Sequence, residues 1–227
     1  LPGIDRPAIA SYFPTIRGEV VMLDLGANLA CDADNLVQFA VMGEVFARNM
    51  LKIKKPTIGI LNVGAEEAKG NQFVREAAIV LQTANLPIQF HGFVEGHDIG
   101  KGTVDVIVTD GFTGNITLKT IEGTAKLFGT LLKSTFSSTV RGKLGYLVAK
   151  PALESFRMRM DPRRYNGAMF VGLNGICVKS HGGTDALGFA NAIQVAHDLI
   201  TNSFNESIKA DCAQLVKALE SPDEIVT

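Results

Sequence analysis

The stretch VDVIVTDGFTGN (104–115) joins an apolar run to a polar, glycine-containing turn, and a helical pattern follows. The apolar run predicts a buried strand, and Gly111 and Gly114 permit a close approach of the backbone to another group. The free N–H groups and the positive dipole end of the helix that starts here favour a bound anion. An ordinary capped helix start explains the same residues about equally well.

The order of strand, polar turn and helix recurs along the chain. Three more such units are predicted, with strands in 19–28, 57–71 and 175–184 and helices at 34–51, 72–84 and 185–204. A shorter run at 87–96 predicts another strand. Apolar strands that alternate with helices predict an α/β fold, a mostly parallel sheet with helices on both faces. We expect a single domain over 1–227, with a protruding helical hairpin inserted at about 126–164.

The hairpin region is strongly basic. Residues 119–164 contain ten Lys and Arg against three Asp and Glu, a net charge of +7, in a chain whose net charge is −1. The stretch GKLGYLVAKPALESF (142–156) predicts a helical hairpin that turns near Lys150–Pro151. Basic and apolar helices favour a membrane surface or an acidic protein partner, and packing against a second subunit is the alternative. The residues expected on this surface are Lys143, Leu144, Tyr146, Leu147 and Lys150.

Composition excludes several classes of protein. The weak overall charge argues against a general nucleic-acid-binding protein, which is basic overall. Cys31, Cys177 and Cys212 lie far apart without a CxxC pair, so reduced cytosolic thiols are a simpler interpretation than a disulfide framework or a zinc site. No apolar run reaches the ~18 residues of a membrane-spanning helix. The chain contains no GxSxG sequence, so a covalent acyl-enzyme is not suggested.

Polar side chains follow the predicted strands. The carboxyl ends of parallel strands share one edge, where ligands bind, so four such turns favour a binding site over ordinary turns and caps. The candidates for phosphate or substrate binding are Gly111, Thr113, Gly114, Asp24, Gly26, Asn28, Asn62, Gly64 and Glu66. The candidates for catalysis are Lys179, His181, Asp110 and Asn115. A structural histidine is an equally good interpretation of His181.

Seven stretches carry a resemblance to a known family: GIDRPAI (3–9), LDLGAN (23–28), LVQFAVMG (36–43), LNVGAEEAKGN (61–71), DGFTGNITLKTIEG (110–123), NGAMFVGLNG (166–175) and KSHGG (179–183). In content and order they are similar to the bacterial acyl-acyl carrier protein:phosphate acyltransferases of phospholipid synthesis. The resemblance covers nearly the whole chain. It implies a homodimer with a fold like that of the isocitrate and isopropylmalate dehydrogenases. It also implies that the chain corresponds to the carboxyl-terminal two thirds of such an enzyme.

The resemblance implies transfer of a fatty acyl group from acyl-acyl carrier protein to inorganic phosphate, giving acyl-phosphate for a downstream membrane acyltransferase. Phosphate is then the nucleophile, so the reaction demands no Ser or Cys nucleophile, metal or organic cofactor. The protein must hold phosphate beside the thioester and stabilise the oxyanion. We expect the Gly111–Asn115 turn to bind phosphate or the oxyanion, with Lys179 and His181 opposite and Asp110 orienting a donor. The residues expected to line the floor are Asp24, Asn28, Asn62 and Glu66.

The expected location is cytoplasmic with peripheral membrane association, since the basic hairpin suits an acidic carrier protein, a membrane surface or the dimer partner. Two other functions stay open. The first is a non-catalytic fragment that keeps the dimer and membrane or carrier surfaces. The second is a nicotinamide-dependent dehydrogenase of the same fold, which needs a metal-binding Asp cluster, and no such Asp spacing occurs. Phosphate-dependent release of the carrier protein discriminates among them.

Overall fold

The computed structural model describes residues 1–84, 86 and 88–220, and these form a seven-stranded sheet in the order β4-β3-β5-β2-β1-β6-β7. The strands are β1 (Ala8–Pro14), β2 (Glu19–Leu23), β3 (Thr57–Leu61), β4 (Gln89–Val94), β5 (Val106–Val108), β6 (Ala168–Val171) and β7 (Val178–Lys179). Neighbours from β4 to β2 pair in parallel, whereas β1–β2, β1–β6 and β6–β7 pair antiparallel. Five strands therefore share one direction, and the predicted mostly parallel α/β sheet is confirmed. Position 87, the first of the strand predicted at 87–96, lies outside the described residues.

Eight helices are described, and four of them begin where a polar turn was predicted. The eight are α1 (Ala33–Met50), α2 (Gln72–Thr83), α3 (Gly96–Lys101), α4 (Gly111–Ser137), α5 (Val140–Arg159), the short 3-10 helix η1 (Pro162–Tyr165), α6 (Ala186–Thr201) and α7 (Phe204–Glu220). Five of them are capped by a side chain that accepts the backbone N–H three residues on: Asp32, Asn71, Asp110, Thr139 and Asp185. The caps satisfy N–H groups that a helix start leaves unpaired, which explains why these helices begin at these residues.

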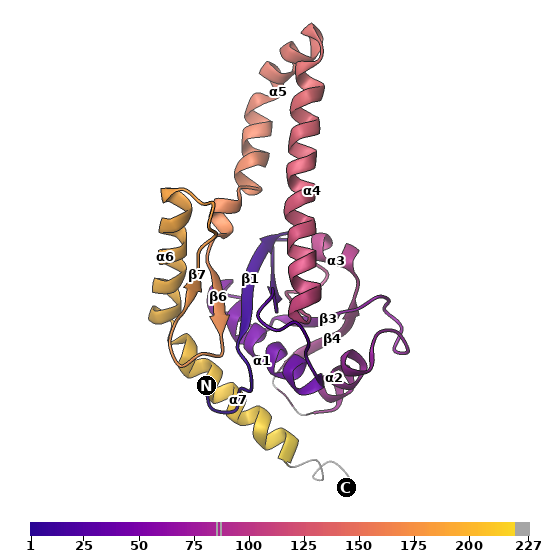
Figure 1. Cartoon of the computed structure of the whole chain (residues 1–227), viewed down its shortest axis with the longest axis vertical. Helices are drawn as coiled ribbons and strands as arrows, with labels where there is room; N and C mark the ends of the chain where they lie inside the picture. Colours follow the sequence, from indigo (N-terminus) through magenta and orange to yellow (C-terminus); the bar gives the residue numbers. More distant parts are fainter. Residues whose placement is uncertain (85, 87, 221–227) are drawn as a thin grey trace.

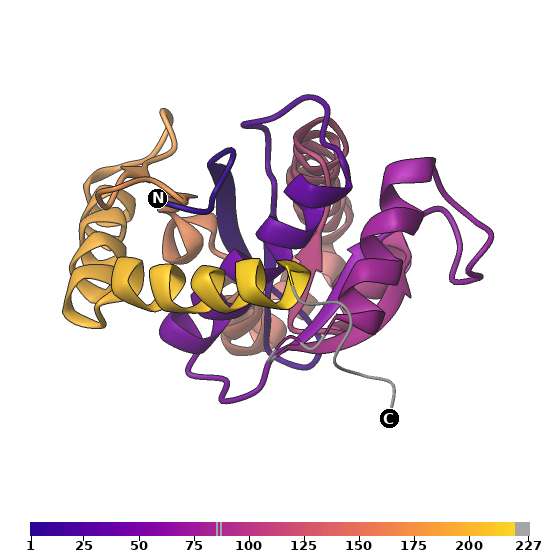
Figure 2. The same cartoon turned by 90° about the horizontal axis from the view of Figure 1, so that it is seen from below.

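Helices cover both faces of the sheet. Alternate residues of β2 enter two cores: Val21 and Leu23 pack under α1 and α2, whereas Val20 and Met22 pack on the other face with residues of α3 and α4. The helices α6 and α7 add to the first core, and Figure 2 shows α7 running alongside α1. Since both faces are buried, the strands are almost continuously apolar rather than alternating.

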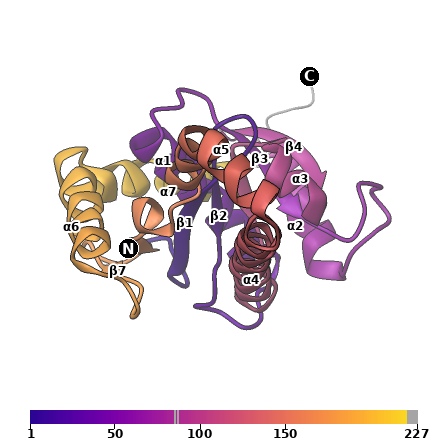
Figure 3. The same ribbon diagram turned by 90° about the horizontal axis from the view of Figure 1, so that it is seen from above.

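The helix α4 starts at the sheet and leaves it. Leu118 and Ile121 pack against the second core, and the remainder of this 27-residue helix, about 40 Å long in all, continues into solvent with α5 beside it (Figure 1). Seen from above, the two helices rise between α6 on one side and α2 and α3 on the other (Figure 3). No residue of α5 is buried. We call α4 beyond Ile121 together with α5 the helical arm.

The turn expected at Lys150–Pro151 is wrong. The helix α5 continues through Pro151, and the chain reverses at Ser138 and Thr139 instead. The hydroxyl of Thr139 accepts the N–H of Gly142 at 2.9 Å and caps α5, so the start of the second helix is stabilised there. A proline inside a helix removes one N–H donor and costs stability, but it does not by itself reverse the chain.

The ends of the strands form two opposite edges of the sheet. We call the edge at which β2, β3, β4 and β5 end the carboxyl edge, and the opposite one the amino edge. The strand β1 runs the other way, and at its end, on the amino edge, Arg159 of α5 donates to the carbonyl oxygen of Thr15 at 2.8 Å. The helical arm therefore leaves from the amino edge. Among the described residues, no helix is both long and apolar enough to cross a bilayer.

Candidate functional site

The carboxyl edge contains a topological switch point between β2 and β5. These two strands are neighbours, but the helices that follow them leave to opposite faces, α1 to the first core and α4 to the second. Such a switch opens a crevice at the carboxyl ends of the strands, where α/β proteins bind ligands. The residues that line it are 24–28 after β2 and 110–115 at the start of α4, and we call this pair of segments the switch-point site. The structure thus brings together the candidates in LDLGAN and DGFTGN.

Asp24 organises the loop after β2. Its carboxylate has no exposed surface, and one oxygen accepts the N–H groups of Ile9, Gly26 and Ala27 at 2.9, 3.1 and 3.0 Å. The other oxygen accepts the backbone N–H and the side-chain amide of Asn28 at 2.7 and 2.9 Å. Five donors therefore occupy a buried carboxylate, which is left neither space nor lone pairs for a ligand. Asp24 holds the loop in shape rather than forming a binding floor.

The loop and the start of α4 are in backbone contact. The N–H of Gly111 donates to the carbonyl oxygen of Asn28 at 2.8 Å, and a Cβ at Gly111 would lie 2.5 Å from that oxygen. A Cβ at Gly114 would lie 1.8 Å from the carbonyl oxygen of Asp24. Only glycine permits this approach, so these two glycines serve packing between the segments.

Most backbone N–H groups in the first turn of α4 donate to acceptors within the protein. Asp110 accepts the backbone N–H and the hydroxyl of Thr113, both at 2.8 Å. With Gly111 bonded to the loop, the N–H of Phe112 is the first-turn donor that pairs with no atom of the described residues. Asp110 therefore acts as a helix cap, and Phe112 carries the remaining backbone donor.

Asn115 lies beside the loop and carries an available amide. Its nitrogen is 3.3 Å from the position that a Cβ at Gly26 would take, and Gly26 has a left-handed φ of +128°. Within the described part of the chain its side chain forms no hydrogen bond, and it is exposed. It borders an open pocket of about 390 Å³ that is also lined by Ile116, Lys119 and Thr120. Asn115 is thus the polar candidate of the switch-point site that is free to contact a ligand.

Cys31 lies close to the site but is not a nucleophile. Its sulfur is 4.0 Å from the carbonyl oxygen of Asn28. Burial raises the pKa of the thiol to about 11. The thiol is therefore neutral near pH 7, and a neutral thiol reacts poorly.

The candidates after β3 form a separate loop on the same edge. The amide of Asn62 donates to the carbonyl oxygen of Lys69 at 3.1 Å, and its oxygen accepts the N–H of Val63 at 2.9 Å. Glu66 is exposed, and Gly64 is buried with its Cβ position 2.6 Å from a Glu66 oxygen. Asn62 closes its own loop, and among the described residues no hydrogen bond joins this loop to the switch-point site.

Lys179 and His181 do not lie opposite the Gly111–Asn115 turn, so this expectation is wrong. They follow β7, which runs antiparallel to β6 and therefore ends at the amino edge, roughly one strand length (~17 Å) from the carboxyl edge. Lys179 is exposed. The N–H of His181 donates to Asn166 at 2.8 Å, and its ring Nδ1 accepts the N–H of Gly183 at 3.1 Å. The ring supports a local turn, as in the structural interpretation of this histidine.

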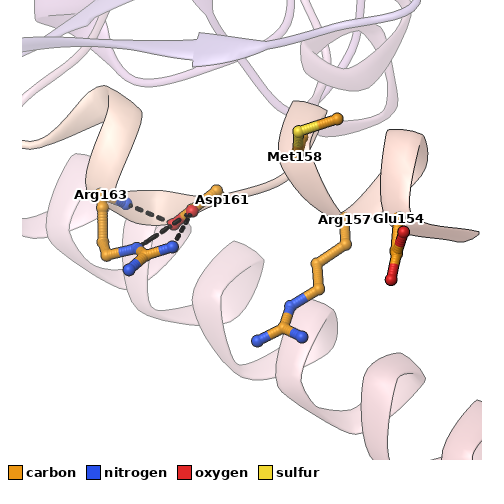
Figure 4. A pocket seen from close by; sticks show the side chains of 5 residues that line it. All are labelled: Glu154, Arg157, Met158, Asp161 and Arg163. Carbon is orange, nitrogen blue, oxygen red and sulfur yellow. Dashed lines mark hydrogen bonds and ion pairs between the residues drawn. The ribbon is translucent and has the colours of Figure 1, made fainter.

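A second open pocket of about 390 Å³ lies where α5 meets η1 (Figure 4). Arg163 faces Asp161 there, with the closest atoms 2.6 Å apart, and it also pairs with Asp185 at 3.0 Å. Arg157 extends over the pocket without a dashed contact in this view, near Glu154. Two acidic and two basic side chains give this pocket no net charge.

Arg6 is a residue at the carboxyl edge that sequence reasoning did not single out. It lies two residues before β1, and its guanidinium donates to the carbonyl oxygen of Ala30 at 3.3 Å. The strand β1 was not predicted, so no edge was assigned to its preceding residues. In the part of the chain that the structure describes, no three His, Cys, Asp or Glu side chains are grouped for a metal ion.

Comparison with known proteins identifies a matching family model and several similar proteins. A family model described as "Fatty acid synthesis protein" matches residues 1–207. A protein named phosphate acyltransferase from Rhodospirillum centenum is 66% identical over 221 residues, which are 97% of this chain and 62% of the relative. Its namesakes from Paramagnetospirillum magneticum and Rhodospirillum rubrum are 60% and 62% identical, over 99% and 95% of this chain and 64% and 62% of their own lengths. The chain thus spans less than two thirds of these relatives.

Among solved structures, the EutD phosphotransacetylase from Staphylococcus aureus matches with a TM-score of 0.46 and 17% identity. The match covers 56% of this chain and 44% of that one. A likeness this partial carries no argument about function.

Proposed function

Because this chain belongs to the fatty acid synthesis protein family, we propose that it acts as a phosphate acyltransferase, which moves a fatty acyl group from acyl-acyl carrier protein to inorganic phosphate. The observation that carries this proposal is the high sequence identity to phosphate acyltransferases over nearly the whole chain. The product is an acyl-phosphate for phospholipid synthesis.

The reaction is a displacement at a thioester. A phosphate oxygen attacks the carbonyl carbon, a new C–O bond forms, and the carbonyl oxygen carries the negative charge of the tetrahedral intermediate. The C–S bond then breaks, and the carrier thiolate leaves and takes a proton from solvent. Phosphate is the nucleophile, so the neutral Cys31 thiol is compatible with this chemistry. The protein has to position two substrates and stabilise the oxyanion.

Two donors of the switch-point site suit that task. The N–H of Phe112 and the amide of Asn115 lie on the first turns of α4, and both are free of partners within the described residues. We assign them to the oxyanion or to a phosphate oxygen. Asp24, Asp110, Gly111 and Gly114 hold the segments that present these donors. Asn62 and Glu66 lie on a neighbouring loop of the same edge, and their contact with substrate is part of the proposal.

The helical arm is the proposed partner surface. Lys143, Leu144, Tyr146, Leu147 and Lys150 are expected to contact a membrane, the acidic carrier or a second subunit, and Leu144 and Leu147 are 60% and 65% exposed. A homodimer with peripheral membrane contact, which hands acyl-phosphate to a membrane acyltransferase, is consistent with this exposure. The finer likeness to the isocitrate and isopropylmalate dehydrogenase fold belongs to the same proposal.

The test is release of the carrier thiol from palmitoyl-acyl carrier protein, with and without inorganic phosphate. We expect phosphate-dependent release, and Asn115→Ala should lower its rate by about 10²- to 10³-fold, as loss of an oxyanion donor does. Gln89→Ala is the matched control, because Gln89 carries an exposed amide at the start of β4, on the amino edge. No release by the unaltered chain would favour a binding fragment without turnover. Equal rates for both variants would remove Asn115 from the site.

A further inference from the structure

We propose that Arg6 binds the phosphate anion at the switch-point site. The proposal rests on the proposed function and adds the cation that the site needs. It names a residue outside the loop and helix discussed so far, and it predicts which substrate's binding depends on that residue.

The charge of the site calls for a cation. Both Asp24 and Asp110 lie at the crevice, and their oxygens accept N–H and O–H donors. Phosphate near neutral pH carries between one and two negative charges, so two neighbouring carboxylates repel it unless a positive group compensates. Lys179, the cation first expected here, lies at the amino edge.

Arg6 is the Lys or Arg that lies within the segments 3–7, 24–32 and 110–116 around the crevice. Lys119 lies one turn further along α4 and lines the pocket beside Asn115, but it is paired with Glu122 at 3.3 Å. The guanidinium of Arg6 donates to the carbonyl oxygen of Ala30 in the loop after β2, which places its charge beside that loop, two residues beyond the switch-point site. Burial raises the pKa of the neighbouring Cys31 thiol, whereas an N–H group of Gly111 and the positive charge of Arg6 lower it. This effect of Arg6 on Cys31 agrees with its placement beside the loop.

The backbone around Arg6 is fixed. The carbonyl oxygen of Pro7 accepts the amide of Asn28 at 2.8 Å, so the residue after Arg6 is bound to the loop that Asp24 organises. On the other side, the N–H of Asp5 donates to Gln38 of α1 at 2.8 Å. A charged side chain on a fixed backbone loses less entropy when it orders around a ligand.

The guanidinium of Arg6 has N–H donors left for a ligand. Its contacts are long, 3.3 Å to Ala30 and 3.4 Å to the carboxylate of Asp5, and its side chain is 50% exposed. Arginine has five N–H donors in a planar fork that matches two oxygens of a phosphate group. Arg6 therefore keeps donors for a second, bidentate partner while staying beside the loop.

The amino edge offers weaker anion sites. In the pocket of Figure 4, Arg163 is already paired with two carboxylates, and Arg157 stands near Glu154. Lys179 has no second cation beside it on the two-residue strand β7. A single lysine ammonium is a point charge, whereas an arginine guanidinium offers a planar fork of N–H donors. The cation at the switch point thus gives phosphate a better-matched partner than either amino-edge group.

The experiment measures phosphate binding and turnover separately. Equilibrium dialysis with radiolabelled inorganic phosphate gives the Kd for the whole chain, and the thiol-release assay gives the KM for phosphate and the KM for palmitoyl-acyl carrier protein. Arg6→Ala should raise the Kd and the KM for phosphate about 10- to 100-fold, the effect of losing charged hydrogen bonds. The KM for the acyl donor should stay within about twofold, and Arg6→Lys should give an intermediate rise, because the charge remains without the fork.

Arg17→Ala is the matched control. Arg17 is also exposed and also donates to one backbone oxygen at 3.3 Å, that of Gly102, but it lies at the amino edge. Its removal should leave all three constants unchanged. Lys179→Ala tests the rival cation in the same assays.

Several results would overturn the inference. They are unchanged phosphate constants in Arg6→Ala, a rise confined to the acyl donor, a loss shared equally by Arg17→Ala, or loss with Lys179→Ala alone. Absence of phosphate binding by the folded, unaltered chain would overturn it as well. Phosphate binding that depends on Arg6 without any turnover would support the inference while the proposed activity of this chain fails. Turnover that is insensitive to Arg6 would leave the activity standing and remove Arg6.

Discussion

At the scale of single residues, buried polar atoms decide the shape of the candidate site. Asp24 is a carboxylate with no exposed surface, and it tolerates burial because five N–H donors replace its water shell. One of those donors comes from β1, and the other four come from the loop of Asp24 itself, two of them from Asn28. The loop therefore wraps around an internal anion, and a ligand has to bind outside that cradle.

Asp24→Asn should destabilise the chain by about 2–4 kcal/mol, because an amide presents N–H groups to donors that then lose their acceptor inside the protein. Urea denaturation monitored by circular dichroism measures this loss. Glu66→Gln, at an exposed carboxylate of a neighbouring loop, should change the free energy of unfolding by less than about 0.5 kcal/mol. An unchanged midpoint for Asp24→Asn would contradict the structural role of its charge.

Two glycines of α4 should respond in opposite directions to the same change. Gly114→Ala should cost about 1–3 kcal/mol, because its Cβ would overlap the carbonyl oxygen of Asp24. Gly123→Ala should stabilise the chain by about 0.5–1 kcal/mol, since it lies inside the helix and its Cβ would meet no atom within 4 Å. Thermal unfolding of the two variants checks both signs. A loss of stability in Gly123→Ala would reveal a contact that this single chain does not show.

At the scale of elements, α4 combines two tasks. Its first turns carry Asn115 at the carboxyl edge, and its far end forms the helical arm beyond the amino edge, about 40 Å away. The apolar side chains on the arm remain exposed, Val148 by 85% and Phe128 by 66%. Such exposure on two adjacent helices is consistent with the partner surface proposed above.

The double change Lys143→Glu and Lys150→Glu should weaken binding to vesicles that contain anionic lipid, since each basic residue near such a surface contributes about 1 kcal/mol. Vesicle co-sedimentation measures the effect, and raised salt should reduce binding of the unaltered chain. Lys54→Glu is the control, because Lys54 is exposed in the loop between α1 and β3, away from the arm. Equal vesicle binding by the double variant would favour a packing role for the arm.

At the scale of the whole molecule, the sheet separates two sets of polar groups. The switch-point site lies at the carboxyl edge, whereas Lys179, His181 and the base of the arm lie at the amino edge, with both cores between them. The arm contributes no buried side chain from α5. The chain thus consists of a sheet with two packed faces and an extension whose stability depends on helix propensity and a few contacts.

Hydrogen exchange should reflect this division. Amides in 124–158 should exchange much faster than those of β2 and β5, because few buried contacts stabilise the arm against local opening. Mass spectrometry of peptides from the labelled chain gives the comparison. Protection of the arm equal to that of the central strands would show that another molecule, such as a second copy, covers it in solution.

Sequence by itself determined the local features of this protein. The capped starts of α1, α2, α4 and α6 follow from Asp or Asn placed before a helical pattern, and the apolar runs of β2, β3 and β5 predicted buried parallel strands. These features depend on residues that are close in the sequence, so short segments are enough to predict them. The same holds for the meeting of LDLGAN and DGFTGN at one edge, since parallel strands align their carboxyl ends.

Only the tertiary structure decided the rest. Because β7 runs antiparallel to β6, Lys179 and His181 lie at the amino edge. The strand β1, which was not predicted, places Arg6 at the carboxyl edge beside the loop after β2. The role of Asp24 depends on the N–H of Ile9, which comes from that same strand. Strand direction and pairing arise from contacts between segments far apart in the sequence, and a two-residue strand such as β7 carries no pattern that reveals its direction. For this reason the sequence identified the polar candidates, but packing of the sheet decided which of them share a site.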